Sequence, residues 1–156
     1  MNITIVSVGK LKEKFWKDAC DEYLKRLKAY AKVEVKEVPD LDPAKCGGEE
    51  LAVLREGAEL LKAIPEKSFV ILLAIEGREV TSEQIASYID NLGIRGTSRI
   101  AFVIGGSCGV SDDVRERADM SLSFGPITLP HNLARIVLLE QIYRAYRIIR
   151  GEAYHK

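Results

Sequence analysis

The sequence predicts an α/β fold, in which a mainly parallel β-sheet carries helices on both faces. Apolar runs of strand length alternate along the chain with segments whose apolar residues recur at helical spacing. Residues 68–75 (SFVILLAI) and 99–106 (RIAFVIGG) are apolar almost throughout, as is typical of strands that are covered on both faces. Because strands alternate with helices, the sheet is expected to be mainly parallel. The 156 residues contain no internal repeat, low-complexity tract or linker, so we expect one domain over residues 1–156.

The first half of the chain supplies two of the expected strands and two of the expected helices. Residues 3–9 (ITIVSVG) predict a strand, and residues 33–39 alternate in the manner of a second strand that ends at Pro39. Residues 12–31 lie between them and predict a helix with one apolar stripe, made of Phe15, Trp16, Ala19, Cys20, Tyr23, Leu24, Leu27 and Tyr30. Residues 40–48 (DLDPAKCGG) predict a loop. The helix expected over residues 49–64 has its apolar face at Leu51, Leu54, Ala58, Leu61 and Ile64.

The second half continues the alternation from the strand at residues 68–75. TSEQ (81–84) matches a capping box and predicts a helix that extends to about Leu92. After the strand at 99–106, Ser111 is expected to cap a short helix, and MSLSFG (120–125) predicts a short strand. The last helix is expected from Asn132 to Arg150, with Gly151 as its C′ residue.

Composition limits the classes of function. Lysines and arginines equal aspartates and glutamates in number, so net charge does not indicate a polyanionic partner. Residues 1–36 nevertheless hold nine basic residues against five acidic ones, and the part of the chain after His131 is also basic. The three cysteines match no zinc spacing and suggest reduced thiols in the cytoplasm. No apolar run reaches the roughly 18 residues of a membrane span, and MNITIVSVGK does not resemble a signal peptide.

Three consecutive strands end in glycine-bearing loops: AIEG (74–77), GGSCG (105–109) and FGPITLP (124–130). The carboxyl ends of parallel strands meet at one edge of a sheet, where ligands of open α/β folds bind. Glycines allow the backbone to approach a ligand closely, although each of them is also compatible with a simple turn. The three loops together predict a pocket at this edge.

The known phosphate and metal motifs are missing. GGSCG is not GxGxxG, it follows a late strand, and no acidic residue stands about 20 positions further on, so a dinucleotide site is poorly supported. There is no GxxxxGK[ST] loop and no metal-ligand spacing, and no serine or cysteine has an obvious neighbouring base. The pocket therefore offers main-chain amides and carbonyls, which suit a nucleoside-bearing cofactor.

The last helix carries two apolar arcs. One contains Ala134, Leu138, Ile142, Ala145 and Ile149, and the other contains Ile136, Leu139, Tyr143 and Tyr146. The sheet can cover one arc, and the second, if exposed, predicts an interface. We expect a homodimer that forms partly through this helix; a fully buried helix is the alternative.

The motifs MNITIVSVGK, EYLKRL, FVIGG and ITLPHNLARIVLLEQIYRAYRIIRGEAYHK resemble the RlmH family of small SPOUT-class methyltransferases, over essentially the whole chain. The resemblance implies a deep trefoil knot near the C-terminus, a homodimer, and S-adenosylmethionine held in the knot loops. It also implies methylation of N3 of a pseudouridine in helix 69 of 23S ribosomal RNA, with the assembled ribosome as the substrate.

The resemblance places the cofactor contacts in the same three loops. Transferred position by position, they fall on Leu73, Gly105, Gly106, Gly125, Pro126, Ile127, Thr128, Leu129 and Pro130. One position departs from the family, because an acid usually follows the equivalent of Leu73 and this chain has Ala74. Glu76 is the candidate to replace that acid.

The candidate catalytic residues lie near the C-terminus. We expect His155 to act as a base or an orienting donor, Arg135 to stabilise the developing anion, and Tyr154 to stack on the extruded base. Gly151 is expected to let GEAYHK turn away from its own domain towards a partner's pocket, whereas packing on the surface is the alternative. His131 is expected to be structural and to help fix the knot loop.

A second function remains open at this stage. A non-catalytic module that binds a nucleotide or RNA would use the same pocket without transferring a methyl group. The residues alone do not identify the modified nucleotide or the catalytic base, and they do not establish whether naked RNA is a substrate.

Overall fold

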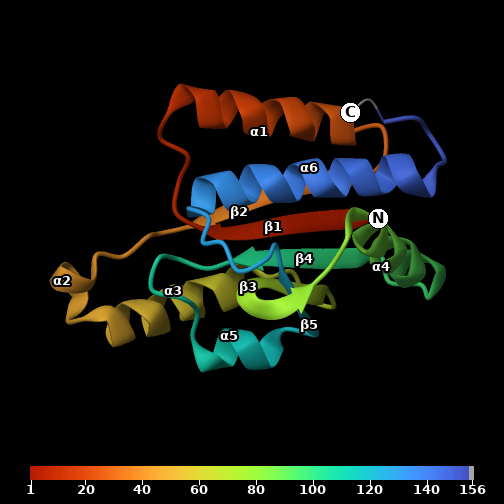
Figure 1. The fold of residues 1–156 in the computed structure, drawn as a ribbon. Coiled ribbons are helices and arrows are strands. Elements are labelled where there is room, and N and C mark those ends of the chain that lie inside the picture. Colours follow the sequence, from red (N-terminus) through yellow and green to blue (C-terminus); the bar gives the residue numbers. More distant parts are fainter. Residues whose placement is uncertain (155–156) are drawn as a thin grey trace.

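A computed structural model describes residues 1–154 and confirms the alternation of strands and helices (Figure 1). The strands are β1 (Asn2–Val8), β2 (Lys32–Val38), β3 (Phe69–Glu79), β4 (Arg99–Ile104) and β5 (Met120–Ser123). The helices are α1 (Lys14–Leu27), α2 (Pro43–Cys46), α3 (Glu49–Ala63), α4 (Ser82–Ile94), α5 (Asp112–Arg117) and α6 (His131–Ile149).

The five strands form one parallel sheet in the order β2-β1-β4-β3-β5. Ile104 pairs with Ser7 on one side and with Leu73 on the other, and Leu73 pairs in turn with Leu122. The register therefore aligns the carboxyl ends of the four strands β1, β4, β3 and β5 at one edge. The predicted α/β fold with a parallel sheet is confirmed.

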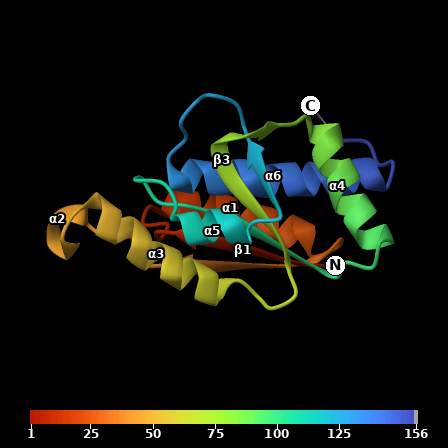
Figure 2. The same cartoon turned by 90° about the horizontal axis from the view of Figure 1, so that it is seen from below.

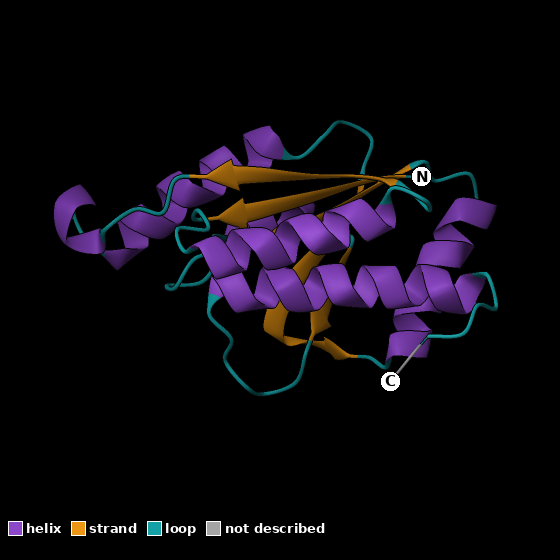
Figure 3. Cartoon of the chain, turned by 90° about the horizontal axis from the view of Figure 1, so that it is seen from above, coloured by secondary structure: helices purple, strands orange, loops and turns teal. Residues whose placement is uncertain are grey.

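Helices cover both faces of the sheet. α1, α6 and α4 lie on one face, and α3 and α5 lie on the other (Figures 1 and 2). Seen from above, α1 and α6 lie side by side over the strands (Figure 3). The two faces bury separate apolar clusters, one containing Phe102 and Ile142 and the other containing Leu60 and Val103. Two helix layers over one sheet bury both faces of the strands, as their apolar runs predicted.

α6 is covered more completely than the sequence suggested. It contacts α1 and α4 as well as the sheet, so Leu139 and Tyr146 of the second arc are buried. Tyr143 of the same arc packs against Tyr23 and Tyr30 of the α1 segment. The inference that a partner must cover the second arc was wrong, because α1 of the same chain covers it. The homodimer itself stays a prediction.

The predicted face of α3 was right at its end, where Ile64 is buried and Leu61 packs against the core, and wrong at Leu54 and Ala58. Leu54 is 53% exposed and Ala58 is exposed. The buried residues are Ala52, Glu56, Gly57 and Leu60. Gly57 lies so close to Ser111 that any side chain at position 57 would collide with it. This close approach to the start of α5 sets the rotation of α3 against the sheet.

Local signals determine several element boundaries. Thr81 caps α4 with the expected capping box, Ser111 caps α5, and Gly151 follows α6 with a φ of 64°. α1 ends earlier than predicted because the amides of Tyr30 and Ala31 both turn back to the carbonyl of Leu27. The expected loop over residues 40–48 contains the short helix α2, which starts at Pro43 after an Asp42 cap.

The path of the chain through a knot and the single-domain assignment stay predictions of the family resemblance and of the sequence. Among residues 1–154, no helix is both long enough and apolar enough to cross a bilayer.

Candidate functional site

The three glycine-bearing loops lie at the shared carboxyl edge of the sheet. The register that joins Leu73, Ile104 and Leu122 places the starts of these loops beside one another. β3 is irregular here, because Leu73 and Arg78 both pair with Leu122, which leaves residues 74–77 outside the ladder. Gly77 permits this detour, since a Cβ at that position would lie 2.8 Å from the carbonyl carbon of Leu122. Residues 74–77, which the sequence predicted as a loop after the strand, are therefore a bulge inside β3, where backbone lies directly against backbone.

The loop after β4 is packed equally tightly. An ideal Cβ on Gly106 would lie 2.6 Å from Oε2 of Glu56 and 3.2 Å from Cγ1 of Val8. Gly106 also bridges to Gly109, which closes the loop on itself. The segment presents main chain rather than side chains at this edge, as the sequence predicted.

Glu56 is a residue that sequence reasoning missed. It projects from α3 to the underside of the β4 loop and is only 5% exposed. Its Oε1 accepts a hydrogen bond of 3.1 Å from the amide of Leu41, whereas Oε2 has no partner among the described residues. Burial, and then the nearby charge of Asp40, raise the pKa of this carboxyl. A glutamate beside Gly57, on a helix whose other buried residues are apolar, was the available signal.

The start of α6 is held by a second polar cluster. The ring of His131 packs on Gly9, where a Cβ would come within 2.7 Å of it, and Gly9 has a φ of 92°. Arg135, which is 1% exposed, donates to the carbonyl of Gly9 at 2.9 Å and to Oε2 of Glu37 at 2.8 Å. Burial and the charge of Arg135 lower the pKa of His131. The cluster joins the β1 and β2 ends to the helix that follows the residue 124–130 loop.

The two predicted catalytic residues that the structure describes, Arg135 and Tyr154, bind different partners within one chain. Arg135 lies inside the start of α6, with its guanidinium bound to Glu37 and Gly9. Tyr154 lies alongside the middle of α6, where its hydroxyl donates to Oε1 of Glu140 at 2.7 Å. His155 is outside the described residues. Glu140 is five positions beyond Arg135, which corresponds to about 7.5 Å along the helix axis.

The tail folds back onto its own helix over residues 151–154. Arg144 makes two hydrogen bonds to Glu140, at 2.9 and 3.1 Å, and its guanidinium lies 4.0 Å from the centre of the Tyr154 ring. Tyr143 meets the same ring edge-on. Over residues 151–154 the tail packs on its own helix, which was the alternative for this segment, because Glu140 and Arg144 offer it partners. The EQIYRA segment contains that Glu–Arg pair at i and i+4 spacing, which was the signal that sequence reasoning missed.

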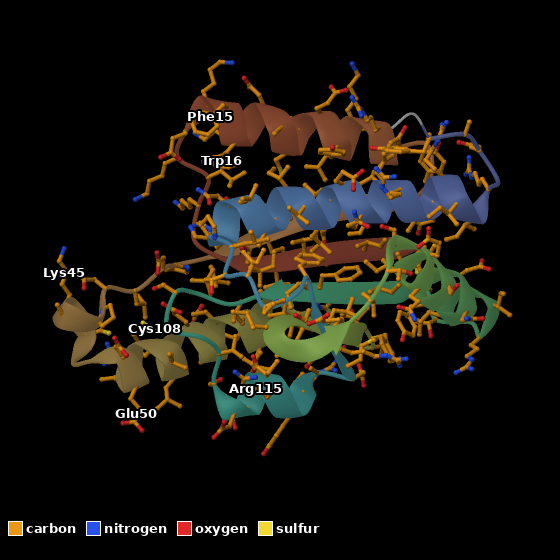
Figure 4. The ribbon with its side chains drawn as sticks, viewed as in Figure 1. Phe15, Trp16, Lys45, Glu50, Cys108 and Arg115 are labelled. Carbon is orange, nitrogen blue, oxygen red and sulfur yellow. The ribbon has the colours of Figure 1, made fainter. Side chains whose placement is uncertain are left out.

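Neither Ala74 nor Glu76 takes the place of the acid that usually follows the equivalent of Leu73 in the family. Ala74 packs against the apolar cluster beneath the sheet. Glu76 binds Arg115, whose place on α5 is labelled in Figure 4. Main-chain hydrogen bonding, followed by Arg115, lowers the pKa of Glu76. Among residues 1–154, no three histidine, cysteine or carboxylate side chains are grouped as metal ligands.

Comparisons with known proteins agree with this architecture. Residues 1–155 match the model of a family described as predicted SPOUT methyltransferase. The chain is 55% identical to the Ribosomal RNA large subunit methyltransferase H of Shouchella clausii and to that of Bacillus cytotoxicus, with full coverage of both chains in each case. The protein of the same name from Bacillus thuringiensis is 54% identical, again over both full lengths.

The fold is also similar to a solved structure, that of a probable methylase family protein from Haemophilus influenzae Rd KW20. The TM-score is 0.54 at 14% sequence identity, over 99% of this chain and 70% of the other. At this level of identity the likeness concerns the fold alone.

Proposed function

The chain belongs to the SPOUT methyltransferase family, and from this premise we propose that it methylates N3 of a pseudouridine in helix 69 of 23S ribosomal RNA on the assembled ribosome. Family membership makes the protein a methyltransferase. Full-length relatives named for the ribosomal large subunit indicate large-subunit RNA as the substrate. The finer assignment to the nucleotide and its N3 atom rests on the TLPH…GEAYH resemblance.

The residues at the carboxyl edge fit S-adenosylmethionine as the methyl donor. Gly105 and Gly106 let the β4 loop pack closely on Val110 and Glu56 and so keep its main chain at this edge, and Gly125 adopts a φ of 104° in the loop after β5. Glu56 supports the β4 loop from beneath, where its Oε2 lies behind Gly106. The meeting of the three glycine-bearing segments at one carboxyl edge of the sheet is the observation that carries the proposal.

Leu73, Gly105, Gly106 and residues 125–130 are the residues that would hold the cofactor. When bound, it supplies a methyl group on a sulfonium, whose sulfur leaves as a neutral thioether when the methyl group is transferred to nitrogen. The protein's own task is to align the base, since correct orientation alone can lower a barrier by several kcal/mol. The N3 imide must also lose its proton as the new N–C bond forms, and we propose His155 as the acceptor of that proton.

Tyr154 is proposed to stack on the extruded base, and the structure adds Arg144 as the cation beside its ring. Arg135 is the other candidate for stabilising charge on the base. Its guanidinium would have to exchange Glu37 for the substrate, because both of its Nη atoms are already bonded. Measurements of kcat and of cofactor affinity in Arg135→Lys and in Arg144→Lys separate the two candidates. Replacing the residue that stabilises charge on the base should lower kcat and leave cofactor affinity unchanged.

A homodimer belongs to the proposal for a geometric reason. Within one chain, Tyr154 lies beside Glu140 rather than beside the loops at the start of α6. A symmetric pair brings the tail of one copy to the loops of the other, which makes each active site composite. Two exposed apolar side chains are available to an interface: Phe15 near the start of α1, which is 63% exposed (Figure 4), and Ile127 in the loop before α6, which is 72% exposed.

One experiment tests the proposed function directly. The protein is incubated with radiolabelled S-adenosylmethionine and either whole ribosomes or naked 23S RNA, and helix 69 is then analysed by mass spectrometry. Label at one pseudouridine of helix 69 in ribosomes is the expected result. Cofactor binding without label in any ribosomal RNA would instead support the alternative of a non-catalytic binding module.

A further inference from the structure

A group of charged and aromatic side chains joins the end of α1 to the start of the C-terminal tail. Tyr30 lies in the turn after α1, and its hydroxyl donates to Oε2 of Glu152 at 2.6 Å. Arg147 of α6 donates to the same hydroxyl at 3.2 Å and forms an ion pair with Glu152 at 2.8 Å. We call these three residues, Tyr30, Arg147 and Glu152, the tail clamp.

The clamp acts on the tail backbone as well as on its side chains. The side chain of Arg147 also donates to the carbonyl of Ala153. The main-chain carbonyl of Arg147 accepts a hydrogen bond of 2.9 Å from the amide of Glu152. The peptide units 151–152 and 153–154 are therefore both tied to one residue of α6. Because a single Cα–Cα step is 3.8 Å, fixing Ala153 leaves Tyr154 little freedom of position.

The ring of Tyr30 is held independently of its hydroxyl. It stacks on Tyr146 with centroids 5.8 Å apart, meets Tyr143 edge-on at 5.9 Å, and has the guanidinium of Arg150 4.5 Å from its centre. Removal of the hydroxyl alone should leave these ring contacts intact. The hydroxyl is thus available for a specific role beyond packing.

We propose that Tyr30 is a positioning residue for the catalytic tail: its hydroxyl orders Arg147 and Glu152, and these set the path of residues 151–153 and with it the location of Tyr154. This inference rests on the proposed function for its catalytic consequence, since Tyr154 is there assigned to the substrate base. The ordering of the tail is a property of the free protein and does not depend on that assignment.

The test compares Tyr30→Phe with Tyr88→Phe, which removes a hydroxyl from a partly buried tyrosine of α4 whose hydroxyl has no hydrogen-bond partner among residues 1–154. The first measurement is hydrogen exchange of the C-terminal peptide that contains the Glu152 amide. The amide donates to the main-chain carbonyl of Arg147, and the hydrogen bond from the Tyr30 hydroxyl to the Glu152 carboxylate should hold this arrangement closed by about a further tenfold. We expect exchange to accelerate by about that factor in Tyr30→Phe and to be unchanged in Tyr88→Phe.

The second measurement is methyl transfer to ribosomes, with cofactor affinity from calorimetry as the check on folding. In Tyr30→Phe we expect kcat to fall by about tenfold while cofactor affinity stays at the wild-type value. Glu152→Gln should have a similar effect, and the double variant should lose no more than either single one, because both act through one clamp. Additive losses in the double variant would overturn the proposal.

The two measurements separate the failure of this inference from failure of the proposed function. Wild-type exchange in Tyr30→Phe overturns the clamp, whatever the activity. Faster exchange together with wild-type kcat shows that the clamp does not position a catalytic group and also overturns the proposal. If the wild-type protein transfers no methyl group to ribosomal RNA, the proposed function fails and the catalytic role of Tyr30 fails with it.

Discussion

Gly106→Ala is the sharpest test of the site, because the structure specifies what the added methyl group would meet. The new Cβ would lie 2.6 Å from Oε2 of Glu56, whereas a carbon and an oxygen need about 3.2 Å, so one of them must move by roughly 0.6 Å. Glu56 is buried and is tied through Oε1 to Leu41, and Val8 lies on the other side at 3.2 Å. The loop itself is therefore expected to shift.

The expected cost follows from overpacking. Small-to-large changes in packed sites cost about 1–3 kcal/mol of unfolding free energy, which outweighs the ~0.4–1 kcal/mol that Gly→Ala gains where the backbone is ordinary. For a chain of this length each kcal/mol lowers Tm by about 2–4 °C. A displaced β4 loop should also weaken cofactor binding by about tenfold or more, since one tenth of the affinity corresponds to ~1.4 kcal/mol.

Urea denaturation and calorimetry with S-adenosylmethionine measure the two effects. Gly93→Ala is the matched control, because its Cβ would meet Met1 at an ordinary 3.5 Å. In the double variant Gly106→Ala with Glu56→Ala the collision with the carboxylate disappears, so the two changes should be clearly non-additive. The reasoning is refuted if Gly106→Ala matches Gly93→Ala in stability and binds the cofactor as the wild type does.

Further predictions concern charge, the tail and association. Burial raises the pKa of Glu56, so the contribution of this residue to stability is present at low pH and is lost as the pH rises through its folded-state pKa. Glu56→Gln should therefore be more stable than the wild type at pH 8, and the two stabilities should converge towards pH 5. Equal stability of the two proteins at both pH values would contradict this. Burial lowers the pKa of His131, so stability should fall as the pH drops below about 6.5, and His131→Gln should flatten that slope in urea denaturation. Deletion of residues 153–156 should leave a folded protein that binds cofactor but has lost methyl transfer; transfer at the wild-type rate would remove Tyr154 and His155 from catalysis. Sedimentation at micromolar concentration should show a dimer that Phe15→Glu weakens, and a monomeric wild type would end the composite-site proposal.

The sequence by itself determined the order and type of nearly all the elements. Continuous apolar runs identified β3 and β4 as strands buried on both faces, and short-range chemistry located Thr81, Ser111 and Gly151 at helix ends. These signals depend on neighbours within a few positions, so they can be interpreted without knowing the fold. The alignment of the three glycine-bearing loops followed as well, because parallel strands necessarily place their carboxyl ends together.

Only the tertiary structure decided which surfaces meet and which charges pair. Helical periodicity showed that α6 has two apolar arcs, but it could not show that α1 rather than a partner covers the second. For α3, the contact between Gly57 and Ser111 set a rotation that the strongest apolar residues did not predict. Arg135 finds Glu37 at a separation of 98 residues, and Tyr30 finds Glu152 at a separation of 122. Such pairs form because α6 packs against α1 and β1 from the start of the chain, and no local pattern encodes that proximity.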